Sequence, residues 1–388
     1  MTAPAPTPLR PTDLRSVRDA VLETTGTLAI AGARTAASWG GDLHAIDAVL
    51  DTTGLAGVIT HNPGDMTVSA YAGTPLRDLN ETLAAHGQQV AFDAARVACG
   101  ATLGGLVATA DAGPAALARG SMRDLVIGAT VVLADGTVAR SGGHVIKNVA
   151  GYDLAKLMHG SYGTLGVLVE VVLRLHPVPR KAATLALDCS LAEAAGYAAP
   201  VLDGPYEAVA VEWRSHSRGD GSGPGATESG RLLVRVEATP DALGGRVQRL
   251  LGALGSGAAE AEPEEWAAHA ERVRGRPGQA VLRIGARPSM LPGLLAALPG
   301  AATNSAALTV GLGTGVATAA LPASAAGVVA AHQAVHAAGG TSTLRERPAG
   351  LGAPAWGPPP SAVRVFKAVK TALDPKARLG PGRFDPWM

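Results

Sequence analysis

Residues 160–177, GSYGTLGVLVEVVLRLHP, constrain the fold more than any other segment of this sequence. Gly160, Gly163 and Gly166 recur every third residue and lead directly into an apolar run that favours a β-strand. Glycine tolerates positive φ and lets another backbone or a ligand approach the main chain closely. Such spacing alone is more often a turn than a ligand site. We therefore predict a turn that leads into a strand, and we weigh a ligand role only together with other segments.

Two further segments are rich in glycine: residues 31–41, AGARTAASWGG, and residues 99–113, CGATLGGLVATADAG. A run of consecutive main-chain amides can cradle an anion such as a pyrophosphate. None of the three segments follows the order strand, Gly-x-Gly-x-x-Gly, helix that defines a Rossmann unit. The sequence therefore does not support a nicotinamide-dinucleotide site of that type.

The bulk composition bounds the partners of the chain. Its 388 residues, 47% of them hydrophobic, suffice for two or three domains with sizeable cores. The formal net charge is +1, so the chain offers no strong field to a nucleic acid or an acidic membrane surface. Aromatic residues make up only 3% of the chain, which also argues against a base-stacking surface. No nucleic-acid partner is expected.

The two cysteines, Cys99 and Cys189, lie far apart in the sequence. They do not make a disulfide framework, and two thiols cannot hold an iron–sulfur cluster that takes four ligands. The N-terminus lacks the pattern of a signal peptide, and no apolar run reaches the roughly 20 residues needed to span a bilayer. A cytoplasmic protein is expected, with any membrane contact at the inner face and made only through partners.

The first region, up to about residue 180, mixes short strands and helices. A helix is predicted from Thr12 to Gly26, and a second from a Thr74 cap through Pro75 to Gly87. The Asp135-Gly136 pair predicts the turn of a β-hairpin. Further strands are predicted at 27–33, on both sides of the turn at 62–64, and at 165–177.

From residue 181 the pattern changes to strands that alternate with helices, which is typical of an antiparallel sheet with helices on one face. Residues 215–230 have the composition of a loop and are interpreted as a mobile hairpin tip. Residues 347–360 are a Pro/Gly linker ahead of a last helix. The predicted fold class is α+β. The predicted domains are 1–180, an α/β cap domain at 181–346, and a linker with a C-terminal segment at 347–388.

Three strings taken together are more specific than any glycine pattern: GATLGGLVAT, RGSMRDLVIGATVVLADGTV and KNVAGYDLAKLMHGSYGTLGVLVEVVLRLHP. They resemble the two-subdomain, PCMH-type FAD-binding domain of the vanillyl-alcohol oxidase superfamily, and within it the FAD-binding subunits of glycolate oxidase. The likeness covers residues 28–180 and returns at 373–384, LDPKARLGPGRF. That tail resembles a closing motif which packs back on the flavin domain.

The resemblance implies that the glycine-rich segments wrap an extended FAD. Residues 32–35 would face the pyrophosphate, 100–105 the ribityl and pyrophosphate groups, and 160–168 the flavin ring and the adenine side. The first loop is poorer in glycine than is usual in the family, and it lacks the histidine to which some members attach flavin, so dissociable FAD is expected. The implied cofactor-binding residues are Gly32, Ala33, Arg34, Thr35, Gly100, Ala101, Thr102, Leu103, Gly104, Gly105, Gly113, Arg123, Gly160, Ser161, Gly163, Gly166, Val167 and Leu168.

The function implied by the resemblance is that of an FAD-binding subunit of a glycolate (2-hydroxy-acid) oxidase or dehydrogenase. Catalytic relatives carry a histidine and a Gly-Asp-Gly-Asn signature near residues 311–317, where this chain has only glycines among small residues. The partners implied are therefore a paired catalytic flavoprotein subunit and an iron–sulfur subunit. Two alternatives stay open: a self-sufficient FAD-dependent oxidase of another alcohol or hydroxy acid, and a non-catalytic assembly subunit.

Other residues are weighed between a structural and a functional role. Cys99 is expected to be a small buried thiol. His332 and His336, four residues apart on a predicted helix, are expected to pack or face solvent, so no metal site is predicted. Arg283 and Arg287 either clamp a carboxylate or cover a surface. Lys147 either holds the developing negative charge of the flavin or a subunit contact, or it is a surface or structural lysine. Tyr152 and Asp153 are expected to order the same loop by hydrogen bonds, without a catalytic role. No catalytic base is identified.

Overall fold

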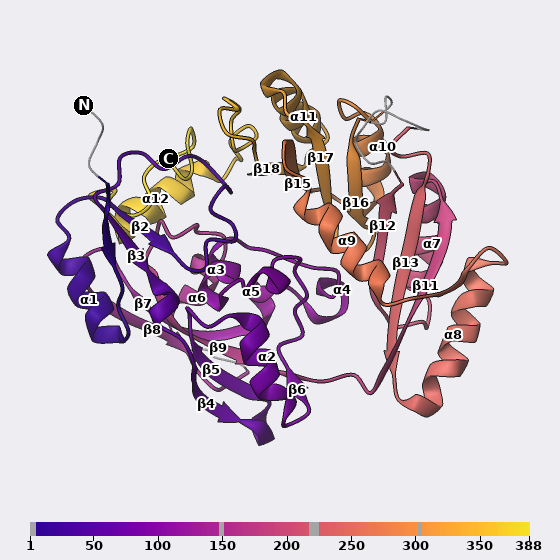
Figure 1. Ribbon diagram of the computed structural model, residues 1–388, viewed down its shortest axis with the longest axis horizontal. Coiled ribbons are helices and arrows are strands. Elements are labelled where there is room, and N and C mark those ends of the chain that lie inside the picture. The colour runs from indigo at the N-terminus through magenta and orange to yellow at the C-terminus, as the bar shows by residue number, and fades with distance from the viewer. Residues whose placement is uncertain (1–4, 147–150, 217–224, 302–304) are drawn as a thin grey trace. The chain divides into compact units, whose positions relative to one another are not determined.

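The computed structural model describes residues 5–146, 151–216, 225–301 and 305–388 (Figure 1). The chain forms two compact units. Unit 1 comprises residues 1–112, 120–178 and 359–388, and unit 2 comprises residues 113–119 and 179–358. Each unit mixes helices with sheets, and the α+β class predicted from the sequence is confirmed.

Unit 1 is built on two main sheets. One is parallel and has three strands, and the other is antiparallel and has five. In the order of their pairing, the parallel strands are β1 (Thr7–Leu9), β3 (Ala48–Asp51) and β2 (Leu28–Ala31). The antiparallel strands are β4 (Val58–Asn62), β5 (Thr67–Tyr71), β9 (Val167–Arg174), β7 (Val126–Val132) and β8 (Val138–Gly142). Strands β6 (Gln88–Gln89) and β10 (His176–Pro177) form a separate pair.

The longer helices of unit 1 cover these sheets. They are α1 (Leu14–Glu23), α2 (Leu76–Ala84) and α12 (Val363–Leu373), and the shorter ones are α3 (Leu103–Ala108), α5 (Met122–Leu125) and α6 (Leu154–Met158). Strand β9 contributes buried side chains to both hydrophobic cores of the unit, Val167 and Val169 to one and Val171 and Leu173 to the other. The apolar run after the glycine triplet is therefore a central strand, as expected from its sequence.

Turn chemistry accounts for several local predictions. The Asp135-Gly136 hairpin is confirmed, because Gly136 has φ +80° and connects β7 to β8. Helix α1 begins after Asp13, whose carboxylate accepts a hydrogen bond from the Ser16 amide. The prediction that Thr74 caps helix α2 is wrong, because the residue at the N-cap of α2 is Pro75. The Thr74 hydroxyl instead accepts a hydrogen bond from the Gly57 amide at 2.9 Å.

Unit 2 contains one antiparallel sheet of eight strands (Figure 1). In the order of their pairing these are β14 (Ala259–Ala261), β11 (Lys181–Cys189), β13 (Gly230–Ala238), β12 (Ala208–Ser215), β16 (Ala307–Gly311), β17 (Val316–Pro322), β15 (Gln279–Gly285) and β18 (Thr341–Glu346). Strand β17 was not predicted, because its Ala- and Thr-rich residues have no strong strand pattern. Half of the predicted hairpin tip at 215–230, residues 217–224, lies outside the described residues.

Helices cover both faces of this sheet, so the expectation of helices on one face is wrong. Four helices share a core with one face: α7 (Leu191–Asp203), α8 (Pro240–Leu254), α10 (Leu291–Ala296) and α11 (Ala325–Ala337). Helix α9 (Glu264–Arg274) lies on the other face, where Arg214 of β12 donates to the Glu265 carbonyl at 3.1 Å. Its neighbours on β12, Val211 and Trp213, point into the main core. The alternation along β12 therefore places α9 opposite the other helices.

The boundaries of the units differ from the predicted domains in two places. Residues 113–119, predicted in the first domain, belong to unit 2. They contain α4 (Ala116–Arg119), where Arg119 donates to the Glu237 carboxylate of β13 at 2.8 Å and Leu117 packs against the core. The linker up to residue 358 also belongs to unit 2, and the chain from 359 onward belongs to unit 1.

The C-terminal segment is anchored to unit 1 by a buried network. The Asp374 carboxylate accepts hydrogen bonds from Lys370 Nζ at 2.6 Å and from the Leu379 amide at 2.7 Å. The Arg378 guanidinium donates to four main-chain carbonyls of the first region, which belong to Val21, Thr24, Gly26 and Ala134. Leu379 is fully buried and forms a bridge beside Leu28 of β2. The tail therefore packs against the edge of the parallel sheet.

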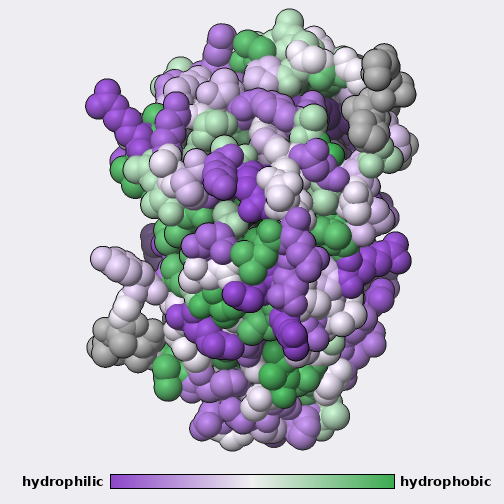
Figure 2. Space-filling view, turned by 90° about the vertical axis from the view of Figure 1, so that its left-hand side faces the viewer, coloured by the Kyte–Doolittle hydropathy of each residue, from purple (hydrophilic) through white to green (hydrophobic). Residues whose placement is uncertain are grey.

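Hydrophobic residues on the surface are scattered. On the face shown in Figure 2, they form small patches that are separated by hydrophilic residues. Scattered exposure of this kind is normal for protein surfaces. Of the helices in the described ranges, none combines the length and the apolar character that a membrane crossing requires.

Candidate cofactor site

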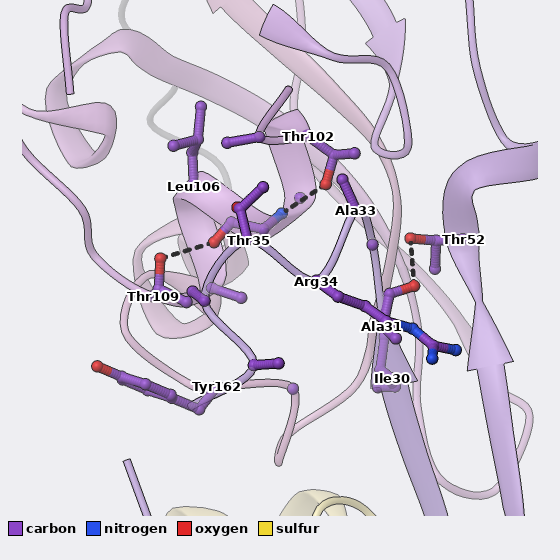
Figure 3. A pocket seen from close by; sticks show the side chains of 18 of the residues that line it. Ile30, Ala31, Ala33, Arg34, Thr35, Thr52, Thr102, Leu106, Thr109 and Tyr162 are labelled. Atoms are coloured by element: carbon purple, nitrogen blue, oxygen red, sulfur yellow. Dashed lines mark hydrogen bonds between the residues drawn. The ribbon is translucent and has the colours of Figure 1, made fainter. Parts of the chain in front are cut away.

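A cavity of unit 1 with a volume of about 280 Å³ lies where β2, α3 and the 160–166 turn meet (Figure 3). Most of its lining comes from residues 29–37, 101–111 and 161–168, and further lining residues are Leu43, Val49, Thr52, Arg96 and Arg383 of the tail. In Figure 3 the Tyr162 ring and the Arg34 side chain extend in opposite directions. The cavity is thus assembled by the tertiary fold from the three glycine-rich segments.

The loop after β2 presents bare main chain to the cavity. Among the described residues, the amides of 32–35 donate no hydrogen bond to another part of the chain. Arg34 has φ +58°, which turns the backbone sharply at this point. A Cβ atom added at Gly32 would lie 2.4 Å from Thr102 Oγ1, so only glycine lets the loop pass this close to α3. Adjacent amides without partners beside an arginine suit an anionic group such as a pyrophosphate.

Helix α3 forms a second wall. Thr102 is its N-cap and accepts a hydrogen bond from the Gly105 amide, while Thr109 Oγ1 closes the other end by donating to the Gly105 carbonyl at 2.8 Å (Figure 3). Gly104 packs directly on the end of β5, because its amide donates to the Ala72 carbonyl at 2.7 Å. The small residues of this segment therefore hold α3 against the sheet and also keep the cavity open.

The 160–166 turn uses its three glycines differently. Gly160 and Gly163 have φ of +80° and +74°, which a turn requires. Gly166 has ordinary backbone angles, but a Cβ there would lie 2.7 Å from Val131 of β7. The amides of Gly160 and Tyr162 donate to the last carbonyls of α3 at 3.0 and 2.8 Å. Most of this turn's amides thus serve the fold, and Gly163 and Tyr162 face the cavity.

Two arginines hold the loop of residues 35–41 in place. Arg96 is buried, donates to the Thr35 carbonyl at 2.7 Å, and places its guanidinium 4.3 Å from the centre of the Trp39 ring. Arg383 of the tail donates to the carbonyls of Ala37, Trp39 and Gly41 at 3.1–3.2 Å. Both side chains brace residues 35–41, the segment that follows the free amides.

Charges near the cavity are partly balanced. Burial alone would raise the pKa of Asp51, but hydrogen bonds from the Thr53 hydroxyl and amide and the charge of Arg34 bring that pKa below its ordinary value. Asp51 therefore stays ionised and attracts the Arg34 guanidinium. The titratable side chains that line the cavity itself are Arg34, Arg96, Asp111, Tyr162 and Arg383. The positive ones outnumber the single carboxylate, which suits a ligand with negative charge.

Most residues expected at the site lie together around this cavity. Those that line it are Gly32, Ala33, Arg34, Thr35, Ala101, Thr102, Gly104, Gly105, Ser161, Gly163, Gly166 and Leu168. Those that do not are Gly100, Leu103, Gly113, Arg123, Gly160 and Val167. Leu103 and Val167 are core residues, Gly100 and Gly160 form turns, and Gly113 belongs to unit 2. Arg123 donates to the Lys156 carbonyl at 3.2 Å.

Sequence reasoning missed several lining residues. Arg96, Thr52 and Asp111 carry no motif of their own, and they reach the cavity only because the strands and α3 bring them there. Tyr162 stands between two residues that were expected, and its φ of +52° turns it toward the cavity wall. Arg383 belongs to the recognised tail motif, which was the one available signal for it.

Several other expectations have structural outcomes. Cys99 is exposed, so the expectation of a buried thiol is wrong, because a 3-10 turn ends beside it at Gly100. Burial raises the pKa of the Cys189 thiol to about 11. Asp153 accepts a hydrogen bond from the Lys156 amide as the cap of α6, and Tyr152 is exposed. Lys147 lies outside the described residues.

His332 has a structural role. Its Nε2 donates to the Pro354 carbonyl at 3.1 Å, so in the neutral ring Nδ1 accepts from the Ser342 hydroxyl at 2.6 Å. Burial lowers its pKa, although the Pro354 carbonyl acts in the opposite direction. Within the described residues, no three His, Cys, Asp or Glu side chains gather as metal ligands would. Arg283 is half-buried on β15 and Arg287 is exposed beyond its end, so a carboxylate clamp by this pair stays a prediction.

A comparison with protein families identifies unit 1. Residues 8–142 match a family described as FAD binding domain. Unit 1 contains an FAD-binding domain. The resemblance seen in the sequence is confirmed, and the cofactor of this domain is FAD. The residues present fit that cofactor, because unpartnered amides beside Arg34 suit its pyrophosphate and the small side chains of α3 leave room beside them.

The relatives of this FAD-binding domain are oxidoreductase chains. The glycolate oxidase subunit GlcE of Escherichia coli is 41% identical over 145 residues, which are 37% of this chain and 41% of that protein. The mitochondrial D-lactate dehydrogenase [cytochrome] of Arabidopsis thaliana is 41% identical over 116 residues, 30% of this chain and 20% of that protein. The glycolate oxidase subunit GlcD of Bacillus subtilis is 46% identical over 84 residues, 22% of this chain and 18% of that protein. The matches thus span at most about two fifths of these relatives.

A solved structure of alkyldihydroxyacetonephosphate synthase shares the fold. It covers 96% of this chain and 75% of its own, with a TM-score of 0.68 and 13% sequence identity. At this identity the likeness concerns the fold alone. It extends the shared architecture from the FAD-binding domain to nearly the whole chain.

Proposed function

We propose that this chain is the FAD-binding subunit of a 2-hydroxy-acid oxidoreductase complex whose substrate is glycolate. The observation that carries the proposal is the cavity of unit 1, with free amides at 32–35, in a domain 41% identical to part of a glycolate oxidase subunit. Oxidation of glycolate to glyoxylate removes a hydride from the carbon that bears the hydroxyl and a proton from its oxygen. Bound FAD supplies the hydride acceptor.

The residues of the chain hold and shield the cofactor in this proposal. The 32–35 amides and Arg34 bind the pyrophosphate, and Arg96 and Arg383 keep that loop in place. The buried side chains of Leu106 and Leu168 exclude water from the apolar wall. These roles bind and orient a flavin, and they assign no base to this chain.

Partner subunits complete the proposed reaction. A chain with two cysteines cannot supply the four ligands of an iron–sulfur cluster, so a separate iron–sulfur subunit takes the electrons onward. The turn between β16 and β17, residues 311–315, offers no histidine or acid for a substrate. We therefore infer that a paired flavoprotein subunit carries out most of the substrate oxidation. The complex would be cytoplasmic and would reach the inner face of the membrane through its partners.

A second candidate is an FAD-dependent dehydrogenase that acts by itself on another hydroxy acid. It is favoured by the 41% identity to part of the Arabidopsis D-lactate dehydrogenase. The two candidates differ in whether the isolated chain turns over.

The first prediction separates these candidates. The purified chain, reconstituted with FAD, is expected to be yellow and to reduce an artificial dye with glycolate or D-lactate at no more than about 1% of the rate of the complete complex, since it lacks a histidine near 311–315. Steady-state dye reduction measures this. Comparable turnover by the isolated chain would establish the self-sufficient enzyme instead, and a chain that stays colourless with excess FAD would indicate an assembly subunit.

The second prediction concerns the attachment of FAD. Among the residues that the structure describes, no histidine or cysteine lines the cavity, so heat or acid denaturation should release all of the flavin into the supernatant. The ratio of yellow colour in the supernatant to that in the pellet measures this directly. A Cys99→Ser variant serves as control, because Cys99 is exposed close to the cavity without lining it. Flavin retained in the wild-type pellet but lost from that variant would contradict dissociable binding.

A further inference from the structure

Unit 2 contains a cavity that the proposed function does not use. It has a volume of about 380 Å³ and lies at the C-terminal end of α9, on the sheet face opposite the main core. Its lining includes four arginines, Arg214, Arg272, Arg274 and Arg276, against one acid, Glu271. Arg214 is paired with Glu265, and the other three arginines leave the lining of the cavity more positive than negative.

The arginines are held by separate, well-fixed elements. The Arg214 guanidinium forms an ion pair with Glu265 and donates to its carbonyl, which ties β12 to α9. Helix α9 ends at Gly275, which has φ +73° and whose amide donates to the carbonyls of Glu271 and Arg272. The Arg276 amide donates to Gln279 Oε1 at 3.0 Å. The turn that carries Arg276 is therefore pinned at both ends.

Close packing fixes the position of that turn over the sheet. A Cβ added at Gly275 would lie 2.3 Å from Val281 Cγ2, so the chain runs directly across β15 at this point. The floor of the cavity is made by Ala307 and Ala320, which are paired neighbours on β16 and β17. Their small side chains give the cavity its depth. The result is a narrow apolar floor beneath a rim of guanidinium groups.

A buried histidine, His269 of α9, lies beside the cavity with its Nε2 3.5 Å from the buried Glu212 carboxylate of β12. His269 of α9 is 3% exposed, and burial lowers its pKa to about 3, with the charges of Arg214 and Arg272 acting in the same direction. The ring is therefore neutral near pH 7. The positive charges of Arg214 and Arg272, which both line the cavity, therefore act together on the His269 ring.

We propose that this cavity binds a small anion with two or more negative charges, either a polycarboxylate or a phosphorylated metabolite. Guanidinium groups pair with both kinds of oxyanion through two parallel hydrogen bonds. The small side chains of Ala307 and Ala320 leave room for a compact carbon skeleton. Several arginines from different elements can pair with several negatively charged groups of one ligand. The site shares no residue with the FAD cavity, so it is a second ligand site of the chain.

Calorimetric titration of the FAD-loaded protein tests this, with citrate and inorganic pyrophosphate as probes and acetate as the singly charged comparison. At about 0.1 M salt, one of the two probes should bind saturably at a single site, and acetate at least about tenfold more weakly. The probe that binds more tightly identifies the carboxylate or the phosphate class. Lack of saturation with both probes up to about 10 mM would overturn the proposal.

Variants localise the binding. Arg276→Gln, which changes an exposed side chain, should weaken the tighter probe several-fold, and the double variant Arg272→Gln/Arg276→Gln by at least about tenfold. Arg249→Gln is the matched control, because Arg249 is exposed on α8 and does not line the cavity. Equal weakening by the control, or a change in the visible flavin spectrum on adding the probe, would place the binding elsewhere and refute the site.

Discussion

Replacing Gly32 by alanine is expected to weaken FAD binding by about 10- to 100-fold and to leave the fold nearly unchanged. The added Cβ would lie 2.4 Å from Thr102 Oγ1, far inside van der Waals contact. Thr102 is buried and caps α3, so the 32–35 loop is the part that moves. That loop carries the free amides, and overpacking of roughly 1–3 kcal/mol corresponds to this loss of affinity. Fluorescence titration of the apoprotein with FAD gives the dissociation constant.

A second substitution that removes the clash tests whether this one contact, and not a general defect of folding, causes the loss of FAD affinity. In the double variant Gly32→Ala/Thr102→Ala the clashing hydroxyl is gone, so the affinity for FAD should recover most of the loss. Thr102→Ala alone loses the cap of α3 and should cost about 1 kcal/mol of stability. Gly64→Ala is the matched control, since nothing lies within 4 Å of its added Cβ. If Gly32→Ala binds FAD as tightly as this control does, the loop does not hold the cofactor.

The glycine-rich segments could be located from the sequence because positive φ and close approach both select glycine. The spacing at Gly160, Gly163 and Gly166 predicted a turn before a strand, and the structure has both. The spacing could not show that Gly166 is small because of Val131 on a strand about 35 residues earlier. The local sequence pattern thus shows that a position excludes a side chain, but the residue that excludes it can lie far away in the sequence.

Charged lining residues were harder to predict than glycines. Arg96, Asp111 and Arg383 reach the cavity of unit 1 from three different elements, and a single arginine or aspartate in a sequence usually faces solvent. Helix α9 was not predicted, and the side of the sheet that it covers follows only from the alternation of Trp213 and Arg214 on β12. Tertiary placement decides both cases.

The anchoring of the tail leads to the second large effect, on stability. Asp374→Ala is expected to lower the free energy of unfolding of unit 1 by about 3–5 kcal/mol. Asp374 is almost fully buried and accepts hydrogen bonds from Lys370 Nζ and from the amides of Arg378 and Leu379. Burial lowers the pKa of Lys370, and Asp374 is the partner that holds it up. Without the carboxylate, the Lys370 ammonium loses its counter-charge and keeps only the carbonyls of Thr164 and Leu379 as acceptors, and the two amides lose their acceptor.

Urea unfolding measures this change in the free energy of unfolding. The release of flavin reports the urea concentration at which the cavity is lost together with the tail. Asp385→Ala is the control on the same tail, because its ion pair with His44 at 2.6 Å is exposed and should contribute less than about 1 kcal/mol. The double variant Lys370→Met/Asp374→Ala removes the unpaired charge, so it should recover part of the stability. The remaining deficit comes from the two amides and from the carbonyls of Thr164 and Leu379, which lose the Lys370 donor. Since Arg383 lies beyond this anchor and lines the cavity, flavin should leave Asp374→Ala at lower urea than the control. Equal unfolding midpoints for Asp374→Ala and Asp385→Ala would show that the buried network does not hold the tail on the FAD-binding domain.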